Sequence, residues 1–180
     1  MFLLYALPVG LLAGLLLGGH LGSLGELRFR LAWLAVAGYL LQSVLFVPRV
    51  GRLVGDLGPL LYVLTNIAVL AAILANRRIR GIPLVAFGAA LNLLVIGLNG
   101  GFMPADHGAY AAAGMAIDGY WNVQFVVDPV LPFLGDWIVL PSWLPGTNVI
   151  SLGDVAIAAG LALVVALGMR GSGPEPVPTV

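Results

Sequence analysis

Five apolar runs, each close in length to a membrane-spanning helix, limit what this chain can fold into. They lie at 2–19, 31–48, 59–76, 82–99 and 150–169. A helix needs about 20 mostly apolar residues to cross the hydrocarbon core of a bilayer. Charged residues make up only 9% of the chain, whereas an ordinary soluble domain carries about 25%. The sequence therefore predicts an all-α fold, a polytopic membrane bundle of five transmembrane helices in a single domain over residues 1–170.

The arginines indicate the orientation of this bundle, because short cytoplasmic loops of membrane proteins are enriched in basic residues. If the N-terminus lies on the outer side of the membrane, that side has two arginines, Arg49 and Arg52. The inner arginines are then Arg28, Arg30, Arg77, Arg78, Arg80 and Arg170. We predict a multi-pass protein of the bacterial cytoplasmic (inner) membrane, with its N-terminus outside, its C-terminus inside and a disordered cytoplasmic tail over 171–180.

Residues 100–148 form one long outer segment between the fourth and fifth helices, which we call the outer cap. A structureless loop of that length is uncommon, so part of it should be ordered. We expect a short helix within Gly108–Ile117 and an interfacial or shallow re-entrant segment over 121–140. The cap also carries aromatic side chains of the kind that anchor at the headgroup level. These are Trp121, Phe125, Phe133, Trp137 and Trp143.

Gly-Asp pairs recur on the predicted outer side, ending at Asp56, Asp136 and Asp154. Two carboxyl groups held close together can share a proton, so that one acts as an acid and the other as a base. Asp154 with Asp136 or Asp106 is therefore a candidate catalytic pair. A second interpretation of Asp154 is structural, since Ser151-x-x-Asp154 before an apolar run is a capping box. For Asp136 the corresponding interpretation is a turn between prolines in a solvated loop.

Small and amide residues suggest how the helices associate. Gly10, Gly14 and Gly18 lie on one face of the first helix and allow a neighbouring backbone to approach closely. That neighbour is either another helix of this chain, which we weight more, or a membrane-protein partner or second copy in a homo-oligomer. Asn92 and Asn99 are seven residues apart and share a face of the fourth helix. Hydrogen bonds between helices are their default role.

The chain resembles a family of uncharacterised bacterial membrane proteins with five helices. The resemblance rests on Asn99-Gly100-Gly101-Phe102-Met103-Pro104, on Leu134-Gly135-Asp136 and on Ile150-Ser151-Leu152-Gly153-Asp154. It implies the five-helix architecture, and the family supplies no activity. Residues in and beside these motifs are our candidate binding residues. They are Asn99, Gly100, Gly101, Met103, Pro104, Asn148, Ser151 and Gly153.

The last part of the chain is also similar to the final catalytic segment of lipoprotein signal peptidases. The similar stretch runs from Trp143 to Ile157, and Val126-Val127-Asp128 resembles the Val-x-Asp stretch of those enzymes. The resemblance implies a catalytic role for Asp154. Where those peptidases have Gly-Asn-x-x-Asp-Arg, this chain has 99–104 with no aspartate or arginine, so the partner of Asp154 would be Asp106 or Asp136.

We therefore predict a non-catalytic membrane subunit or scaffold whose outer cap docks a partner or a lipid headgroup. The alternative is an aspartyl membrane hydrolase using Asp154. A transporter ranks last, because no predicted span has an ionisable residue at its centre. The chain has no cysteine, which excludes thiolate chemistry and thiol-ligated metals. We expect no metal, no cofactor and no nucleic-acid partner.

Overall fold

The computed structural model describes residues 2–115, 122–145 and 149–171. Five main helices coincide with the five apolar runs, and only α4 begins outside its run, one residue early. They are α1 (Ala6–Leu16), α2 (Ala32–Leu45), α4 (Gly58–Leu74), α5 (Ile82–Leu98) and α7 (Leu152–Gly168). Prolines in the first turn start α4 and α5, where a missing N–H costs no helical hydrogen bond. The chain is mostly helical, so the predicted all-α class is confirmed.

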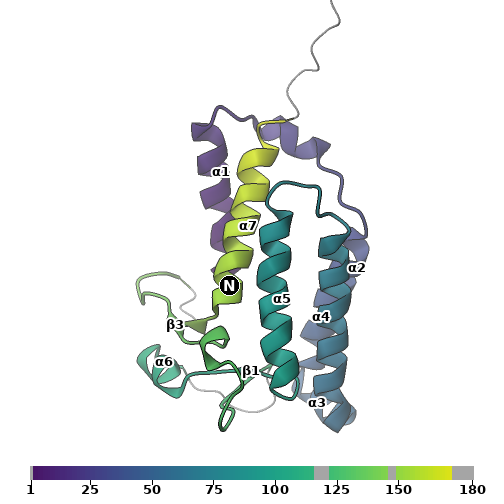
Figure 1. Ribbon diagram of the computed structural model, residues 1–180, viewed down its shortest axis with the longest axis vertical. Helices are drawn as coiled ribbons and strands as arrows, with labels where there is room; N and C mark the ends of the chain where they lie inside the picture. The colour runs from purple at the N-terminus through teal and green to yellow at the C-terminus, as the bar shows by residue number, and fades with distance from the viewer. Residues whose placement is uncertain (1, 116–121, 146–148, 172–180) are drawn as a thin grey trace, which may run out of the picture.

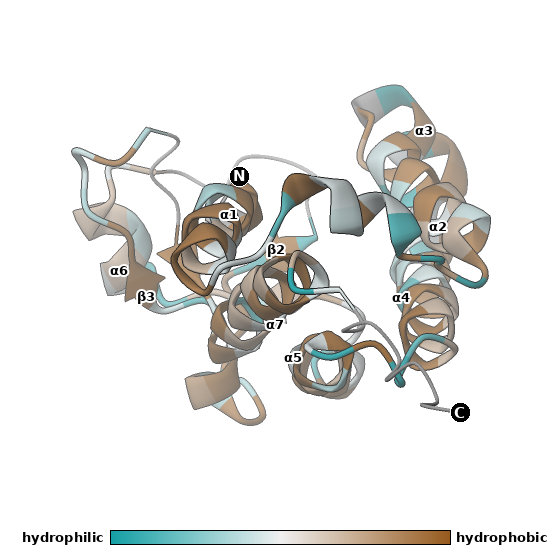
Figure 2. Cartoon of the chain, turned by 90° about the horizontal axis from the view of Figure 1, so that it is seen from above, coloured by the Kyte–Doolittle hydropathy of each residue, from teal (hydrophilic) through white to brown (hydrophobic). Residues whose placement is uncertain are grey.

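The helices are not arranged in chain order. α7 packs between α1 and α5, and α4 packs between α5 and α2. Figure 1 shows the resulting series α1, α7, α5, α4, α2, and Figure 2 shows the same series looking along the helices. The last helix therefore lies near the centre of the bundle, and both ends of the outer cap, which follows α5 and precedes α7, are held by neighbouring helices.

Glycines allow the central helices to approach closely. A Cβ on Gly81 would lie 2.6 Å from the Gly160 carbonyl oxygen, and one on Gly88 would collide with the Gly153 carbonyl oxygen. The contact is reciprocal, because a Cβ on Gly160 would meet Gly81 and Val85, and a Cβ on Gly153 would meet Gly88 and Asn92. Small residues at a helix interface allow this close contact between backbones.

The glycine stripe of the first helix packs inside this chain. A Cβ on Gly10 would lie 2.7 Å from the Ala162 carbonyl oxygen of α7, and one on Gly14 would collide with the Met169 side chain. Gly18 follows the end of the helix with φ +76°, and a Cβ added there would meet nothing within 4 Å. Contact within the chain is thus confirmed for Gly10 and Gly14, while a partner or homo-oligomer at this stripe stays a prediction.

The outer cap is built from short elements below one end of the bundle (Figure 1). Two parallel strands, β1 (Met103–Pro104) and β2 (Val123–Gln124), pair at its centre. Two antiparallel strands, β3 (Ile138–Val139) and β4 (Val149–Ile150), lead into α7. The helix α6 (His107–Ala112) falls partly within the predicted Gly108–Ile117, of which 116–117 lie outside the described residues.

The segment predicted as interfacial or re-entrant contains no long helix between 122 and 140. It holds β2, the 3-10 turn η4 (Pro132–Leu134) and β3. Trp121 and Asn148 lie outside the described residues, as does the tail from 172 onward. One buried cluster joins the cap to the bundle, consisting of Tyr62, Val95, Ile96, Met103 and Leu134.

The opposite end of the bundle carries the arginine-rich loops. The 3-10 turn η2 (Leu21–Glu26) links α1 to α2, and the loop 75–81 links α4 to α5. The His20 N–H donates to the Met169 carbonyl at 2.7 Å, which ties η2 to the end of α7. A further short helix, α3 (Pro48–Val54), precedes α4 at the cap end.

Within the described residues, one helical stretch, Arg49–Leu74, is long and apolar enough by length and composition to cross a membrane. The remaining apolar helices are shorter, with 10–17 residues each.

Candidate functional site

Asp154 is fixed at the start of α7 by a capping box. Its backbone N–H donates to the Ser151 Oγ at 3.0 Å, and its Oδ2 accepts from the Ser151 backbone N–H at 3.2 Å. Its Oδ1 accepts from the Asn92 amide of α5 at 2.8 Å. The Ser151 hydroxyl in turn donates to the Asn92 Oδ1 at 2.9 Å. The predicted capping box is confirmed, and both carboxylate oxygens are engaged in fastening α7 to α5.

Gly153 is required where α7 meets α5. A Cβ at this position would collide with the Asn92 side chain. Because Gly153 has no side chain, Asn92 can reach Asp154 and Ser151 from the neighbouring helix α5. Of the residues predicted around this motif, Ser151, Gly153 and Asp154 lie together, and their partner on α5 is Asn92 and not Asn99.

Asn99 fastens the cap at the C-terminal end of α5. Its amide donates to the Val130 carbonyl at 2.9 Å, and its Oδ1 accepts from the Val130 N–H at 2.8 Å. A further bond runs from its amide to the Val95 carbonyl at 2.7 Å. The side chain is only 8% exposed. Asn99 thus pairs with the backbone of the cap as a neighbouring strand would. Its side-chain hydrogen bonds within the described residues all hold the cap or α5 in place.

The residues after Asn99 turn the chain into the cap. Gly100 and Gly101 have φ of +71° and +89°, a region that favours glycine. A Cβ on Gly101 would also lie 2.6 Å from the Pro59 side chain at the start of α4. Met103 and Pro104 are buried and form β1. This motif therefore builds a tight turn and the first strand of the cap.

Asp136 is the buried carboxylic acid of the cap. Its N–H donates to the Pro104 carbonyl at 2.9 Å, and its own carbonyl accepts from the Asp106 N–H at 2.8 Å. The Tyr110 hydroxyl donates to its Oδ2 at 3.4 Å, a long bond. Its Oδ1 is buried with no partner among the described residues. The side chain is 6% exposed. The turn predicted in a solvated loop is instead a buried residue whose backbone pairs with the segment 104–106.

Burial raises the pKa of the Asp136 carboxyl from 3.8 to about 7. The charge of Asp154 contributes to this increase, and the Tyr110 hydrogen bond opposes it. Burial and the nearby Asp136 charge raise the pKa of the Tyr110 phenol as well. Ionised carboxylates are costly to bury without a partner. Asp136 can therefore hold a proton in weakly acidic surroundings and lose it in alkaline ones.

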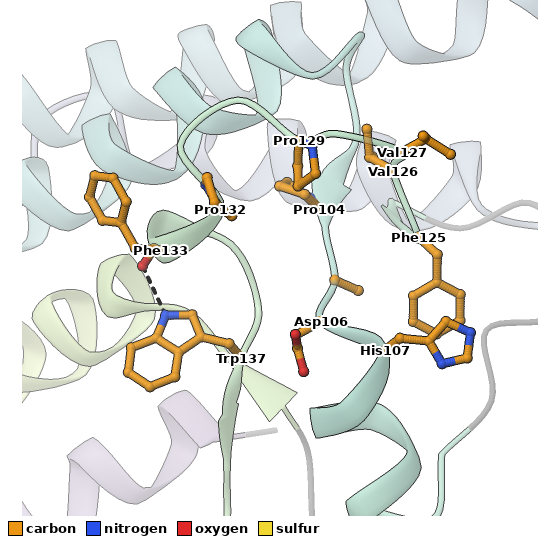
Figure 3. A pocket seen from close by; sticks show the side chains of 11 residues that line it. Pro104, Asp106, His107, Phe125, Val126, Val127, Pro129, Pro132, Phe133 and Trp137 are labelled. Atoms are coloured by element: carbon orange, nitrogen blue, oxygen red, sulfur yellow. Dashed lines mark hydrogen bonds between the residues drawn. The ribbon is translucent and has the colours of Figure 1, made fainter.

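Asp106 has a different position from the other two candidates. Its Oδ1 accepts from the Ala109 N–H at 2.7 Å and caps α6. The residue is exposed, and it lines a hollow of about 710 Å³ in the cap. Figure 3 shows this cap hollow, whose other walls are mainly proline, valine and aromatic side chains. Of the three candidate carboxylates, Asp106 is the one that lines it.

Aromatic contacts shape the walls of the cap hollow. The His107 and Phe125 rings stack with centroids 4.2 Å apart, and Tyr110 meets Phe125 edge to face at 5.8 Å. On the other side, the Trp137 indole N–H donates to the Phe133 carbonyl at 2.8 Å (Figure 3). Phe133 is 57% exposed and Trp137 45%. The hollow is thus a mostly apolar surface with one carboxylate and one imidazole at its edge.

Sequence reasoning missed Tyr110 as the partner of Asp136 and His107 as part of the hollow. Neither had a spacing signal, because each meets its partner across a separation of at least 18 positions that only the fold closes. Within the described residues, no group of three or more His, Asp and Glu side chains lies together to hold a metal ion.

The fold defines a class of helical bundle. Its central helices pack closely through glycines, and a small folded cap covers one end of the bundle. Residues 26–166 match the model of a family of unknown function (DUF5317), and the chain belongs to that family. The match covers the chain from α2 through the cap and all of α7 except its last two residues, and α1 precedes it. No curated protein and no solved structure matches the chain.

Proposed function

We propose that this chain is an integral protein of the bacterial cytoplasmic membrane and acts as a non-catalytic subunit or scaffold. In this proposal five helices cross the bilayer, with the N-terminus and the cap outside and the C-terminus inside. The cap hollow docks a partner or a lipid headgroup. The observation that carries the docking role is the exposed aromatic hollow of the cap. In contrast, the candidate carboxylate of Asp154 is occupied by hydrogen bonds, and that of Asp136 is buried.

The membrane location is supported by an inverted distribution of polar and apolar side chains. Large apolar side chains point away from the bundle, such as Leu16 at 79% exposed and Trp33 and Tyr39 at 68% each. Polar side chains such as Thr65 and Asn76 are buried instead. Figure 2 shows helices that are mostly hydrophobic, with hydrophilic residues concentrated in the connecting segments. Soluble monomers rarely expose contiguous apolar surface on this scale.

Three of the five helices are close to the length that this location requires, whereas α1, with 11 residues, and α2, with 14 residues, are shorter. α4, α5 and α7 have 17 residues each. At about 1.5 Å per residue, such a helix is about 26 Å long, against about 30 Å of hydrocarbon. The orientation is supported by the arginine loops, which gather at the end of the bundle opposite the cap.

Photocrosslinking from one position in the hollow tests the docking role. Val127 lines the hollow and is 87% exposed. Leu53 in α3 is equally exposed at 87% but does not line it, and it provides the matched control on the same side. A photoreactive amino acid is placed at each position in turn, in the full chain within native membranes.

A docking cap gives a discrete adduct from Val127 and not from Leu53. A protein adduct is seen as a shift on a denaturing gel, and a lipid adduct is seen by mass spectrometry. Equal and diffuse crosslinking from both positions would contradict the proposal.

A second candidate function is an aspartyl membrane hydrolase, for which one observation speaks. The pKa of Asp136 is raised to about 7, in part by the charge of Asp154, which is the behaviour of an acid beside an ionised carboxylate. Such an enzyme would use Asp154 with Asp136 or Asp106, as in the resemblance to lipoprotein signal peptidases. The binding of both Asp154 oxygens to Asn92 and Ser151 favours the structural role.

The variant Asp154→Asn separates the two functions. A hydrolase would lose the release of peptides from membranes that contain the wild-type protein, while its folding would be retained. A scaffold would show the same released peptides in both membranes. Comparison of released peptides by mass spectrometry gives the answer.

A further inference from the structure

The end of the bundle opposite the cap contains a hollow of about 520 Å³ lined by four arginines. Arg28 and Arg30 reach it from the segment before α2, and Arg77 and Arg78 from the loop between α4 and α5. Its other lining residues are Leu74, Ala75, Asn76 and Ile79, so no acidic side chain faces it. We call this feature the arginine hollow.

A buried asparagine holds the two arginine-bearing segments together. The Arg30 N–H donates to the Asn76 Oδ1 at 2.7 Å, and the Asn76 amide donates to the Arg30 carbonyl at 2.8 Å. The same amide donates to the Ala72 carbonyl at 2.8 Å. Asn76 is 8% exposed. The backbone at Arg30 is therefore held beside the backbone that carries Arg77 and Arg78.

The backbone beside this clamp is strained. Leu31, which follows Arg30, has φ +55° and ψ 26°, a left-handed conformation that is uncommon for a bulky residue. Strained residues persist only where the surrounding structure holds them. The Asn76 clamp supplies that constraint and directs the chain from Arg30 into α2.

The charge in the arginine hollow is not compensated by the protein. Among the described residues, none of the four guanidinium groups forms an ion pair or hydrogen bond with another side chain. Glu26 lines an adjoining hollow, which also contains Arg80 and shares Arg78 and Ile79 with the arginine hollow, but Glu26 forms no ion pair with Arg78 within the described residues. Four like charges held near one another repel, and an anion between them removes that repulsion. A basic loop needed only for membrane orientation would not require a buried clamp.

We propose that the arginine hollow binds the phosphodiester headgroup of an anionic membrane lipid in the inner leaflet. The inference rests on the proposed membrane location. Guanidinium groups form paired hydrogen bonds with phosphate oxygens, and basic pockets at the cytoplasmic ends of helices suit such headgroups. Leu74, which is 46% exposed beside the arginines, supplies an apolar surface for the lipid chain.

Lipid binding by the full chain in mild detergent tests the proposal. The protein is titrated with dioleoyl phosphatidylglycerol or with zwitterionic dioleoyl phosphatidylcholine, and bound lipid is counted by native mass spectrometry. The site variant is Arg30→Gln with Arg77→Gln. The matched control is Arg80→Gln with Arg170→Gln, which removes the same charge from the same end but outside the arginine hollow.

The wild type should bind phosphatidylglycerol in preference to phosphatidylcholine. Each arginine near an anionic headgroup contributes about fivefold in affinity, so the site variant should bind about 25-fold more weakly. The control should keep most of the wild-type affinity. The variant Asn76→Ala should also weaken binding although every arginine is present. The site variant changes only exposed side chains, so the test stands even if Asn76→Ala fails to fold.

Equal losses in the site variant and the control would overturn the proposal, since diffuse charge would then explain the binding. Displacement of the lipid by soluble glycerol phosphate at equal concentration would overturn the lipid as the ligand. The membrane location is tested separately by alkaline extraction of membranes. A protein that resists extraction but shows no lipid preference contradicts this inference alone, whereas a protein that is extracted contradicts the proposed function.

Discussion

The substitution Asp136→Asn should remove most of a pH dependence of stability that the cap imposes on the protein. Asp136 is 6% exposed, and the pKa of its carboxyl is raised to about 7 from 3.8. In the unfolded chain the carboxyl ionises at its ordinary pKa. In the folded chain it keeps its proton until the pH approaches 7, because its Oδ1 is buried without a partner among the described residues.

The sign and the size of the effect follow from this difference. A folded-state pKa above the unfolded value gives stability that is complete at low pH and is lost as the pH rises toward the folded pKa. The loss levels off above about pH 7. A difference of about three pKa units corresponds to about 4 kcal/mol at about 1.4 kcal/mol per unit. For a chain of this size, that equals a change in the unfolding midpoint of about 8–16 °C.

Thermal unfolding in mild detergent, followed by intrinsic fluorescence at about pH 4 and about pH 8, measures this loss. Other groups titrate too, so the quantity of interest is the difference between wild type and Asp136→Asn. Asp128→Asn is the matched control, since Asp128 is exposed and has φ +49°, a conformation that asparagine tolerates. Wild type and Asp128→Asn should lose stability with rising pH, and Asp136→Asn should lose much less. An equal loss in all three proteins would refute the reasoning.

Three further substitutions, one of them a control, test the packing that holds the cap. Gly88→Ala places a Cβ against the Gly153 carbonyl and should lower the free energy of unfolding by about 1–3 kcal/mol. Gly97→Ala in the same helix meets nothing within 4 Å and should be neutral or slightly stabilising in the same thermal assay. Ser151→Ala removes the N-cap of α7 and should cost about 1 kcal/mol, with faster hydrogen exchange in the first turn of α7. Unchanged exchange there would show that Asn92 alone holds the helix start.

The bundle was predictable because each helix is encoded locally. The apolar run 82–99 contains α5 (Ile82–Leu98), and the run 150–169 contains α7 (Leu152–Gly168), with ends within two residues. Ser151 and Asp154 are three positions apart, so the capping box could also be identified from spacing. The run 31–48 was less accurate, because Pro48 begins the separate helix α3.

The cap was less predictable because distant residues build it. Met103 pairs with Val123, and Ile138 pairs with Ile150, in strands of two residues that are too short to show alternation. The candidate site was affected in the same way. Asn92 and Asn99 share a face of the fourth helix, and their spacing did not show that Asn92, about two turns before Asn99, is the one that reaches Asp154.

Cysteine labelling in intact cells tests the central claim, a five-helix membrane protein with its cap outside. The chain has no cysteine, so one introduced thiol is unique. Val127→Cys lies in the cap, and Arg80→Cys lies in the loop at the other end of the bundle. A membrane-impermeant maleimide should label Val127→Cys in intact cells and Arg80→Cys only after the cells are permeabilised. Labelling of both positions in intact cells, or of Arg80→Cys alone, would contradict the account.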